Sequence, residues 1–148
     1  MNQSLLKQRP SLTIVRRIKA PPAKIYAALT QPEMVSRWWG DGGPVLTAEL
    51  DPRVGGSFRI AFQSLNGETH ECSGDYRQVE TDRRLVFSWS WISTPERVSE
   101  VDIVLRPIPE GTEMTLTHAQ FFDEAARDLH SQGWEYGLDR LTALVMGE

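Results

Sequence analysis

Two hydrophobic periodicities divide the chain. Between residues 11 and 119, most apolar and polar side chains alternate in short runs, which is typical of β-strands with one buried face. From Asp123 onward the apolar positions are spaced by three to five residues, which indicates one long amphipathic helix that ends near Gly147. Strands grouped apart from a long helix favour an α+β protein with an antiparallel sheet.

The short runs predict a specific order of elements. A first strand over residues 11–19 precedes two short helices, one around Ile25 and Leu29 and one over residues 31–38, the latter beginning with a capping box at Thr30 and Glu33. Asn66-Gly67 and residues 107–111 are expected to form hairpin turns, and residues 92–100 a polar loop. Further strands are predicted at residues 45–50, 58–63, 68–79, 85–91, 101–105 and 114–118.

One face of this sheet and one face of the long helix collect large aromatic side chains. The sequence holds five tryptophans, and we expect one of Trp38 and Trp39 to face inward while the other lies at the mouth of a cavity. Rigid aromatic faces suit a flat or aliphatic small molecule, although the same residues could form an ordinary core. The candidate cavity-lining residues are Trp38, Trp39, Phe58, Ile60, Phe62, His70, Tyr76, Phe87, Trp89, Trp91, Ile103, Leu105, Met114, Leu116, His118, Trp134 and Leu138.

Composition excludes several function classes. With 16 basic and 20 acidic residues the net charge is −4, which argues against a nucleic-acid partner. The single cysteine, Cys72, allows neither an internal disulfide nor a cysteine-rich zinc site. Since the chain begins without a signal-like segment and has no long apolar run, we expect a cytoplasmic protein without membrane insertion. A length of 148 residues predicts one domain over residues 1–148.

Candidate chemistry is sparse. His70 and His118 fall on the inward-facing parity of their strands, but the simpler interpretation of His118 is a hydrogen-bonded core histidine, and His130 is expected at the edge of the long helix. A metal site formed by His70, Cys72 and His118 is conceivable, yet this spacing is not diagnostic, and Cys72 is expected to be inert filler. We therefore predict no catalytic constellation, no metal site and no cofactor.

Six short motifs occur in an order that resembles one known family. Over about residues 12–146, which form the core of the predicted domain, the chain is similar to the SRPBCC superfamily of helix-grip proteins. Within it, the chain resembles the branch of the C-terminal domain of the activator of the 90-kDa heat-shock protein ATPase. The resemblance implies an α+β helix-grip fold: a curved antiparallel sheet of six or seven strands around a long C-terminal helix, with an apolar cavity between them. The motifs are residues 18–26 (IKAPPAKIY), 38–40 (WWG), 51–58 (DPRVGGSF), 85–89 (LVFSW), 112–118 (TEMTLTH) and 133–134 (GW).

Three functions are compatible with this resemblance. Relatives in the wider superfamily bind lipids, sterols, polyketides and plant hormones, which favours binding or sequestration of a small hydrophobic molecule. Some relatives are cyclases or aromatases. The first alternative is therefore a cyclase, aromatase or hydrolase that uses His70, Tyr76 or His118 as acid–base groups. The second alternative is a chaperone-regulating interaction module. The chaperone activators carry a separate N-terminal domain for which this chain has no room, so a chaperone partner is not expected, and a monomer or a homodimer is possible.

Overall fold

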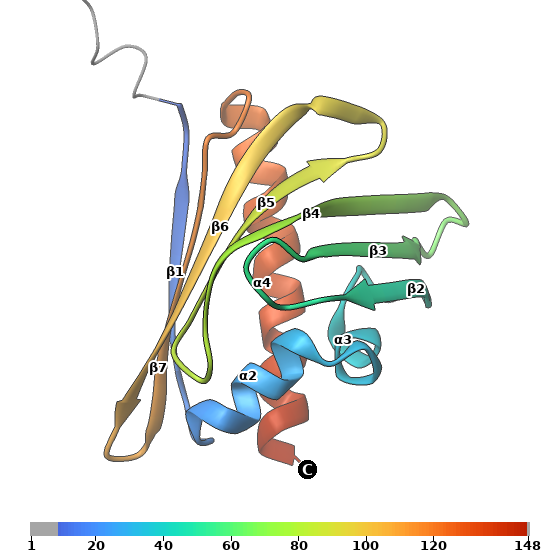
Figure 1. Ribbon diagram of the computed structural model, residues 1–148. Helices are drawn as coiled ribbons and strands as arrows, with labels where there is room; N and C mark the ends of the chain where they lie inside the picture. The colour runs from blue at the N-terminus through green and yellow to red at the C-terminus, as the bar shows by residue number, and fades with distance from the viewer. Residues whose placement is uncertain (1–8, 148) are drawn as a thin grey trace, which may run out of the picture.

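The computed structural model describes residues 9–147. A first strand is followed by two short helices, a run of strands and one long helix, as the hydrophobic pattern predicts (Figure 1). The elements are β1 (Leu12–Ile18), α2 (Pro22–Thr30), α3 (Pro32–Trp38), β2 (Val45–Leu50), β3 (Ser57–Gln63), β4 (Thr69–Glu80), β5 (Arg84–Trp91), β6 (Thr94–Ile108), β7 (Gly111–Ala119) and α4 (Glu124–Gly147).

The strands form one antiparallel sheet that curves around α4 (Figure 1). Its seven strands lie in the order β1-β7-β6-β5-β4-β3-β2, so each strand from β2 to β7 pairs with its neighbours along the chain and β1 closes the edge beside β7. Register shifts interrupt the β4–β5 ladder at Tyr76 and the β5–β6 ladder at Trp89. Because such irregularities bend strands and increase their twist, they help the sheet to wrap around the helix. The predicted α+β helix-grip fold is confirmed.

The core lies between α4 and the middle of the sheet. Ile14, Leu116, Ile103 and Leu85 lie opposite one another on four successive strands, and each is buried. Leu138 and other buried residues of α4 belong to the same hydrophobic cluster. This cluster fixes the position of the helix on the sheet, because burial of each large aliphatic side chain contributes about 1.5–3 kcal/mol.

The ends of the elements follow from local sequence. Asp123 caps α4: its Oδ1 atom accepts a hydrogen bond of 2.8 Å from the backbone N–H of Ala126, as predicted. Asn66-Gly67 forms the turn between β3 and β4, where Gly67 has a φ of +92°. None of the helices among residues 9–147 combines the length and hydropathy that crossing a membrane requires.

Two local predictions are wrong. Most of the expected loop over residues 92–100 belongs to β6, which starts at Thr94 opposite Trp91. Its polar composition suggested a loop because this end of the hairpin is largely exposed and needs no apolar face. The predicted capping box is also absent, since α3 begins after Gln31 without a side-chain cap, and the hydroxyl of Thr30 instead donates to the carbonyl of Tyr26 in α2.

Candidate ligand-binding site

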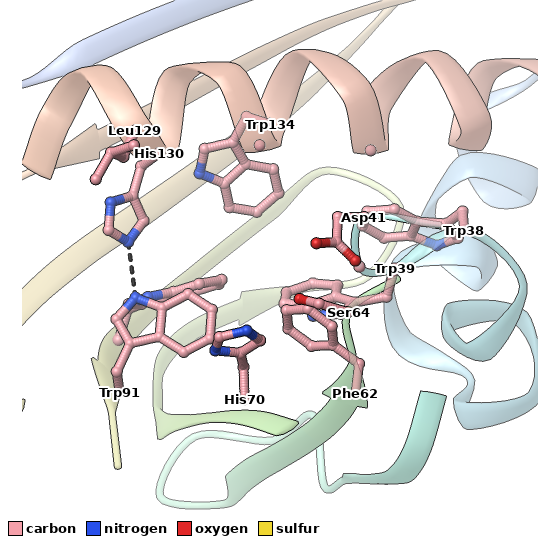
Figure 2. A pocket seen from close by; sticks show the side chains of 14 residues that line it. Trp38, Trp39, Asp41, Phe62, Ser64, His70, Trp91, Leu129, His130 and Trp134 are labelled. Carbon is pink, nitrogen blue, oxygen red and sulfur yellow. Dashed lines mark hydrogen bonds between the residues drawn. The ribbon is translucent and has the colours of Figure 1, made fainter. Parts of the chain in front are cut away.

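A pocket of about 430 Å³ opens between the first half of α4 and the neighbouring ends of α3, β3, β4 and β5 (Figure 2). Side chains that lie far apart in the sequence therefore meet around one space. The predicted residues that line it are Trp38, Trp39, Phe62, His70, Trp89, Trp91 and Trp134. The lining residues that the hydrophobic pattern does not predict are Gly40, Asp41, Ser64, Leu129, His130, Gly133 and Gly137.

The remaining predicted residues lie deeper. Phe58, Ile60, Tyr76, Phe87 and Ile103 surround a second space of only about 20 Å³, which is too small for a ligand. Leu105, Met114, Leu116, His118 and Leu138 line neither space and are buried in the interior. Strand alternation assigns all of these residues to one face of the sheet. It does not show how much of that face the side chains of α4 cover.

The structure separates the roles of Trp38 and Trp39. Trp38 is almost fully buried, donates a hydrogen bond of 2.8 Å from its indole N–H to the carbonyl oxygen of Ala28, and lies against Gly137 of α4. Trp39 is only partly buried and lines the pocket together with Trp89 and Trp134. Trp38 therefore fixes α3 against α4, and this contact places Trp39 at the pocket.

Four tryptophans form a continuous aromatic wall. The rings of Trp39 and Trp89 stack with their centroids 5.5 Å apart, and Trp134 meets Trp39 almost at a right angle, with an interplanar angle of 79°. Trp91 extends the wall, since its ring lies edge-to-face against Trp89 with the centroids 5.5 Å apart. Offset-stacked and edge-to-face arrangements are the favourable ones for aromatic pairs, so these contacts stabilise the wall.

A buried histidine holds one of these tryptophans in place. His118 accepts a hydrogen bond of 3.0 Å at Nδ1 from the indole N–H of Trp134, and its Nε2 lies 2.7 Å from the hydroxyl oxygen of Ser99. A neutral imidazole has one acceptor and one donor, so Nε2 carries the proton and donates to Ser99. Burial lowers the pKa of His118 to about 2, which keeps the ring neutral. His118 is thus a satisfied core histidine that orients Trp134.

A second histidine does the same for Trp91. Nε2 of His130 accepts a hydrogen bond of 2.8 Å from the indole N–H of Trp91, which links α4 to β5 across one end of the pocket (Figure 2). Nδ1 of His130 donates to the carbonyl oxygen of Ala126, 2.7 Å away. Burial lowers the pKa of this ring as well. An edge position alone does not predict this role of His130. The signal in the sequence is its i, i+4 spacing to Trp134, which places both residues on one helix face.

Polar groups are few around the pocket. Asp41, Ser64 and His70 contribute the polar side chains on the side that faces α4, and the carboxylate of Asp41 points toward the space between Trp134 and His70 (Figure 2). Among residues 9–147, no hydrogen-bonding partner reaches the buried indole N–H of Trp89. Buried donors are normally paired, so this N–H group is an exception in the structure.

Comparison with known families decides the classification. Residues 19–146 match the model of the family described as Activator of Hsp90 ATPase homolog 1-like protein. The chain belongs to this family. It is therefore a member of the SRPBCC superfamily, whose fold supports ligand binding in general. Among curated proteins, none matches the chain significantly.

Solved structures agree with the fold of this chain. A protein of Rhizobium leguminosarum is 27% identical with a TM-score of 0.80, and the match covers 95% of this chain and 97% of that one. A protein of Chromobacterium violaceum is 25% identical with a TM-score of 0.81, covering 91% and 96%. The AHSA1 protein of Silicibacter pomeroyi has 24% identity and a TM-score of 0.82, covering 94% and 100%, and this likeness shows the fold alone.

The acid–base candidates do not share one space in this family member. His70 lines the pocket, Tyr76 borders the small interior space, and His118 lies beneath the aromatic wall. Burial raises the pKa values of Tyr76 and of the fully buried Cys72, so both stay protonated at neutral pH. His70, Cys72 and His118 are not brought together either: residues 9–147 contain no group of three side chains placed to hold a metal ion.

Proposed function

We propose that the protein binds or sequesters a small hydrophobic molecule in the pocket between α4 and the sheet, without chemical turnover. The observation that supports this most directly is an open space of about 430 Å³ beside an aromatic wall of four tryptophans. Ligand pockets in proteins typically have volumes of roughly 300–1,000 Å³ and are lined mainly by hydrophobic and aromatic side chains with a few polar groups. The pocket has these properties.

The rigidity of the wall also supports binding. His118 and His130 fix Trp134 and Trp91 through their indole N–H groups, so the apolar surface is held in place before the ligand arrives. A site that needs little ordering loses less free energy on binding, which favours affinity for a flat molecule that fits it. A pocket preformed in this way suits storage or transport of a ligand.

A ligand screen tests the proposal. Lipids, flavonoids and aromatic polyketides are added in turn, and the thermal unfolding temperature and the tryptophan fluorescence are measured. A ligand that enters the pocket raises the unfolding temperature by mass action and changes the emission of the wall tryptophans. If no compound of any class produced either effect, the proposal would be wrong.

A matched pair of variants assigns any binding to this pocket. A Cβ atom added at Gly133 or at Gly147 would meet no other atom within 4 Å, but only Gly133 lines the pocket. Gly133→Phe should therefore obstruct the pocket and abolish binding, whereas Gly147→Phe should leave the affinity unchanged. Equal loss in both variants would show that the effect is not specific to the pocket.

Location and partners are also part of this proposal. We place the protein in the cytoplasm and expect it to act without a chaperone partner. Cys72 is the sole cysteine, and its thiol is buried. The chain therefore forms no internal disulfide and does not need an oxidising compartment, which supports the cytoplasmic location. Cell fractionation tests the location, and recovery of the 90-kDa heat-shock protein in a pulldown would contradict the second expectation.

A further inference from the structure

We infer that the ligand of this pocket is a planar organic cation, such as a fused aromatic ring that carries a quaternary nitrogen. This inference rests on the proposed function and names the chemical class of the ligand. Two independent features carry it: the charges that border the pocket and the arrangement of its aromatic rings.

The charges that border the pocket have one sign. No lysine or arginine is among the lining residues within the described part of the chain, and Asp41 is the single carboxylate. Asp41 has no hydrogen-bond or ion-pair partner among residues 9–147, in contrast to acids such as Asp102 and Glu113, which pair with arginines. Its carboxylate, which points into the pocket, is thus free to meet a positive charge (Figure 2).

His130 does not change this balance. Both ring nitrogens of His130 are occupied, by the indole N–H of Trp91 and by the carbonyl of Ala126. A second proton on His130 would remove its acceptor for Trp91, and burial lowers its pKa. His130 therefore stays neutral and adds no positive charge that would repel a cation.

The aromatic rings provide the second feature. The face of an indole carries negative electrostatic potential and attracts cations more strongly than the faces of tyrosine and phenylalanine. Because Trp39 and Trp134 meet at 79°, they form a corner in which a flat molecule can stack on one indole face and contact the other ring with its edge. A flat ring gains stacking area there, and its positive charge gains a favourable cation–π interaction. Asp41 lies at the same opening and attracts that charge.

Other ligand classes fit less well. The carboxylate of a fatty acid would find no lysine or arginine among the described lining residues and would be repelled by Asp41. A neutral hydrocarbon would gain from the aromatic wall but would leave Asp41 unpaired and partly desolvated, which is unfavourable. The cation alone uses both features of the site.

Three probes of nearly equal shape separate these classes. Equilibrium dialysis measures the dissociation constants of N-methylquinolinium, 1-methylnaphthalene and 1-naphthoate, which are a cation, its neutral isostere and an anion. We expect the cation to bind about tenfold more tightly than the neutral isostere, which corresponds to a cation–π contribution of ordinary size together with the charge of Asp41. The anion should bind more weakly than both. Added salt should weaken the binding of the cation and leave that of the neutral probe unchanged.

A matched pair of variants tests the role of Asp41. Asp41→Asn should lower the affinity for N-methylquinolinium by about threefold to fivefold, as expected for a solvent-exposed ion pair, and should not affect 1-methylnaphthalene. Glu110→Gln is the control because it makes the same change in net charge at the exposed turn between β6 and β7, at the other end of the sheet (Figure 1). This control variant should bind all three probes as the original protein does.

The outcomes distinguish the inference from the proposed function. If the neutral probe or the anion binds as tightly as the cation, the inference is wrong but the pocket is still a binding site. If the cation keeps its advantage unchanged in Asp41→Asn, the assignment of that carboxylate is overturned. If no probe binds while circular dichroism shows a folded protein, the inference is contradicted, whereas the proposed function is decided by the screen of lipids, flavonoids and polyketides.

Discussion

Two tryptophans of the pocket owe their orientation to one neutral imidazole each. Trp134 donates to His118, and Trp91 donates to His130. An indole that packs only through its faces can tilt, whereas one that is also held at its N–H has a single favourable orientation. The two histidines are therefore positioning residues that shape the aromatic wall. His118 does so from beneath the wall without lining the pocket, whereas His130 lines the pocket beside Trp91.

Replacement of His118 should destabilise the fold. His118→Leu leaves the buried indole N–H of Trp134 and the hydroxyl of Ser99 without this partner, and an unsatisfied buried polar group costs about 1–3 kcal/mol. We expect urea unfolding to show a loss of about 2 kcal/mol. The half-exposed His70 provides the control, and His70→Leu should change the free energy of unfolding by less than about 0.5 kcal/mol. Equal losses would contradict the assignment of His118.

At the scale of elements, α4 serves both the core and the pocket. Its second half contributes buried residues such as Leu141 and Val145 to the core, whereas its first half borders the pocket with His130, Gly133 and Trp134. The glycine at position 133 leaves open space at the surface of the helix where most residues would project a side chain into the pocket. This position is therefore a compromise between helix stability and pocket volume.

Gly133→Ala should stabilise the protein. A Cβ atom there meets no atom within 4 Å, and alanine in a helix is more favourable than glycine by about 0.5–1 kcal/mol. Differential scanning calorimetry should show a higher unfolding temperature. Gly74→Ala in β4 is the opposite case, because its Cβ would lie 1.8 Å from the carbonyl oxygen of Ser88 and the strands would have to separate. A lower unfolding temperature for Gly133→Ala would show that the glycine has another structural role.

The elements could be predicted from sequence because their hydrophobic faces are local patterns. Alternation places β5 and β7 correctly, whereas the start of β6 at Thr94 was missed because an exposed hairpin end needs no alternation. The site was less predictable. The inward position of Leu116 follows from parity, but its burial beneath α4 depends on packing between distant elements. Asp41 lies in a glycine-rich loop without periodicity, so no local pattern could place it at the pocket.

At the scale of the whole molecule, the interior between sheet and helix is half core and half pocket. Around Leu138, side chains of α4 and the sheet leave almost no space, whereas beside Trp134 a pocket of about 430 Å³ opens between the same two layers. The closed half provides the stability that holds the open half in shape. The stability of the fold and the shape of the pocket are thus linked, and the neutral form of His118 contributes to both.

This link predicts that stability depends on pH. The ordinary pKa of histidine is 6.5, and burial lowers that of His118 to about 2 in the folded protein. Between these values the unfolded chain binds a proton at His118 and the folded chain does not, so the free energy of unfolding falls as the pH falls below about 6.5. The contribution of this residue approaches about 1.4 kcal/mol for each pH unit, since one pKa unit corresponds to that free energy.

Chemical denaturation between pH 7.5 and 5 measures this dependence, and His118→Gln isolates it. The amide of glutamine can accept from Trp134 and donate to Ser99 but does not titrate, so this variant should keep much of the stability at pH 7.5 and lose less of it on acidification. Carboxylates titrate in both proteins, and their effect cancels in the comparison. If the two proteins lost stability equally between pH 6.5 and 5, His118 would not be the group that couples the fold to pH.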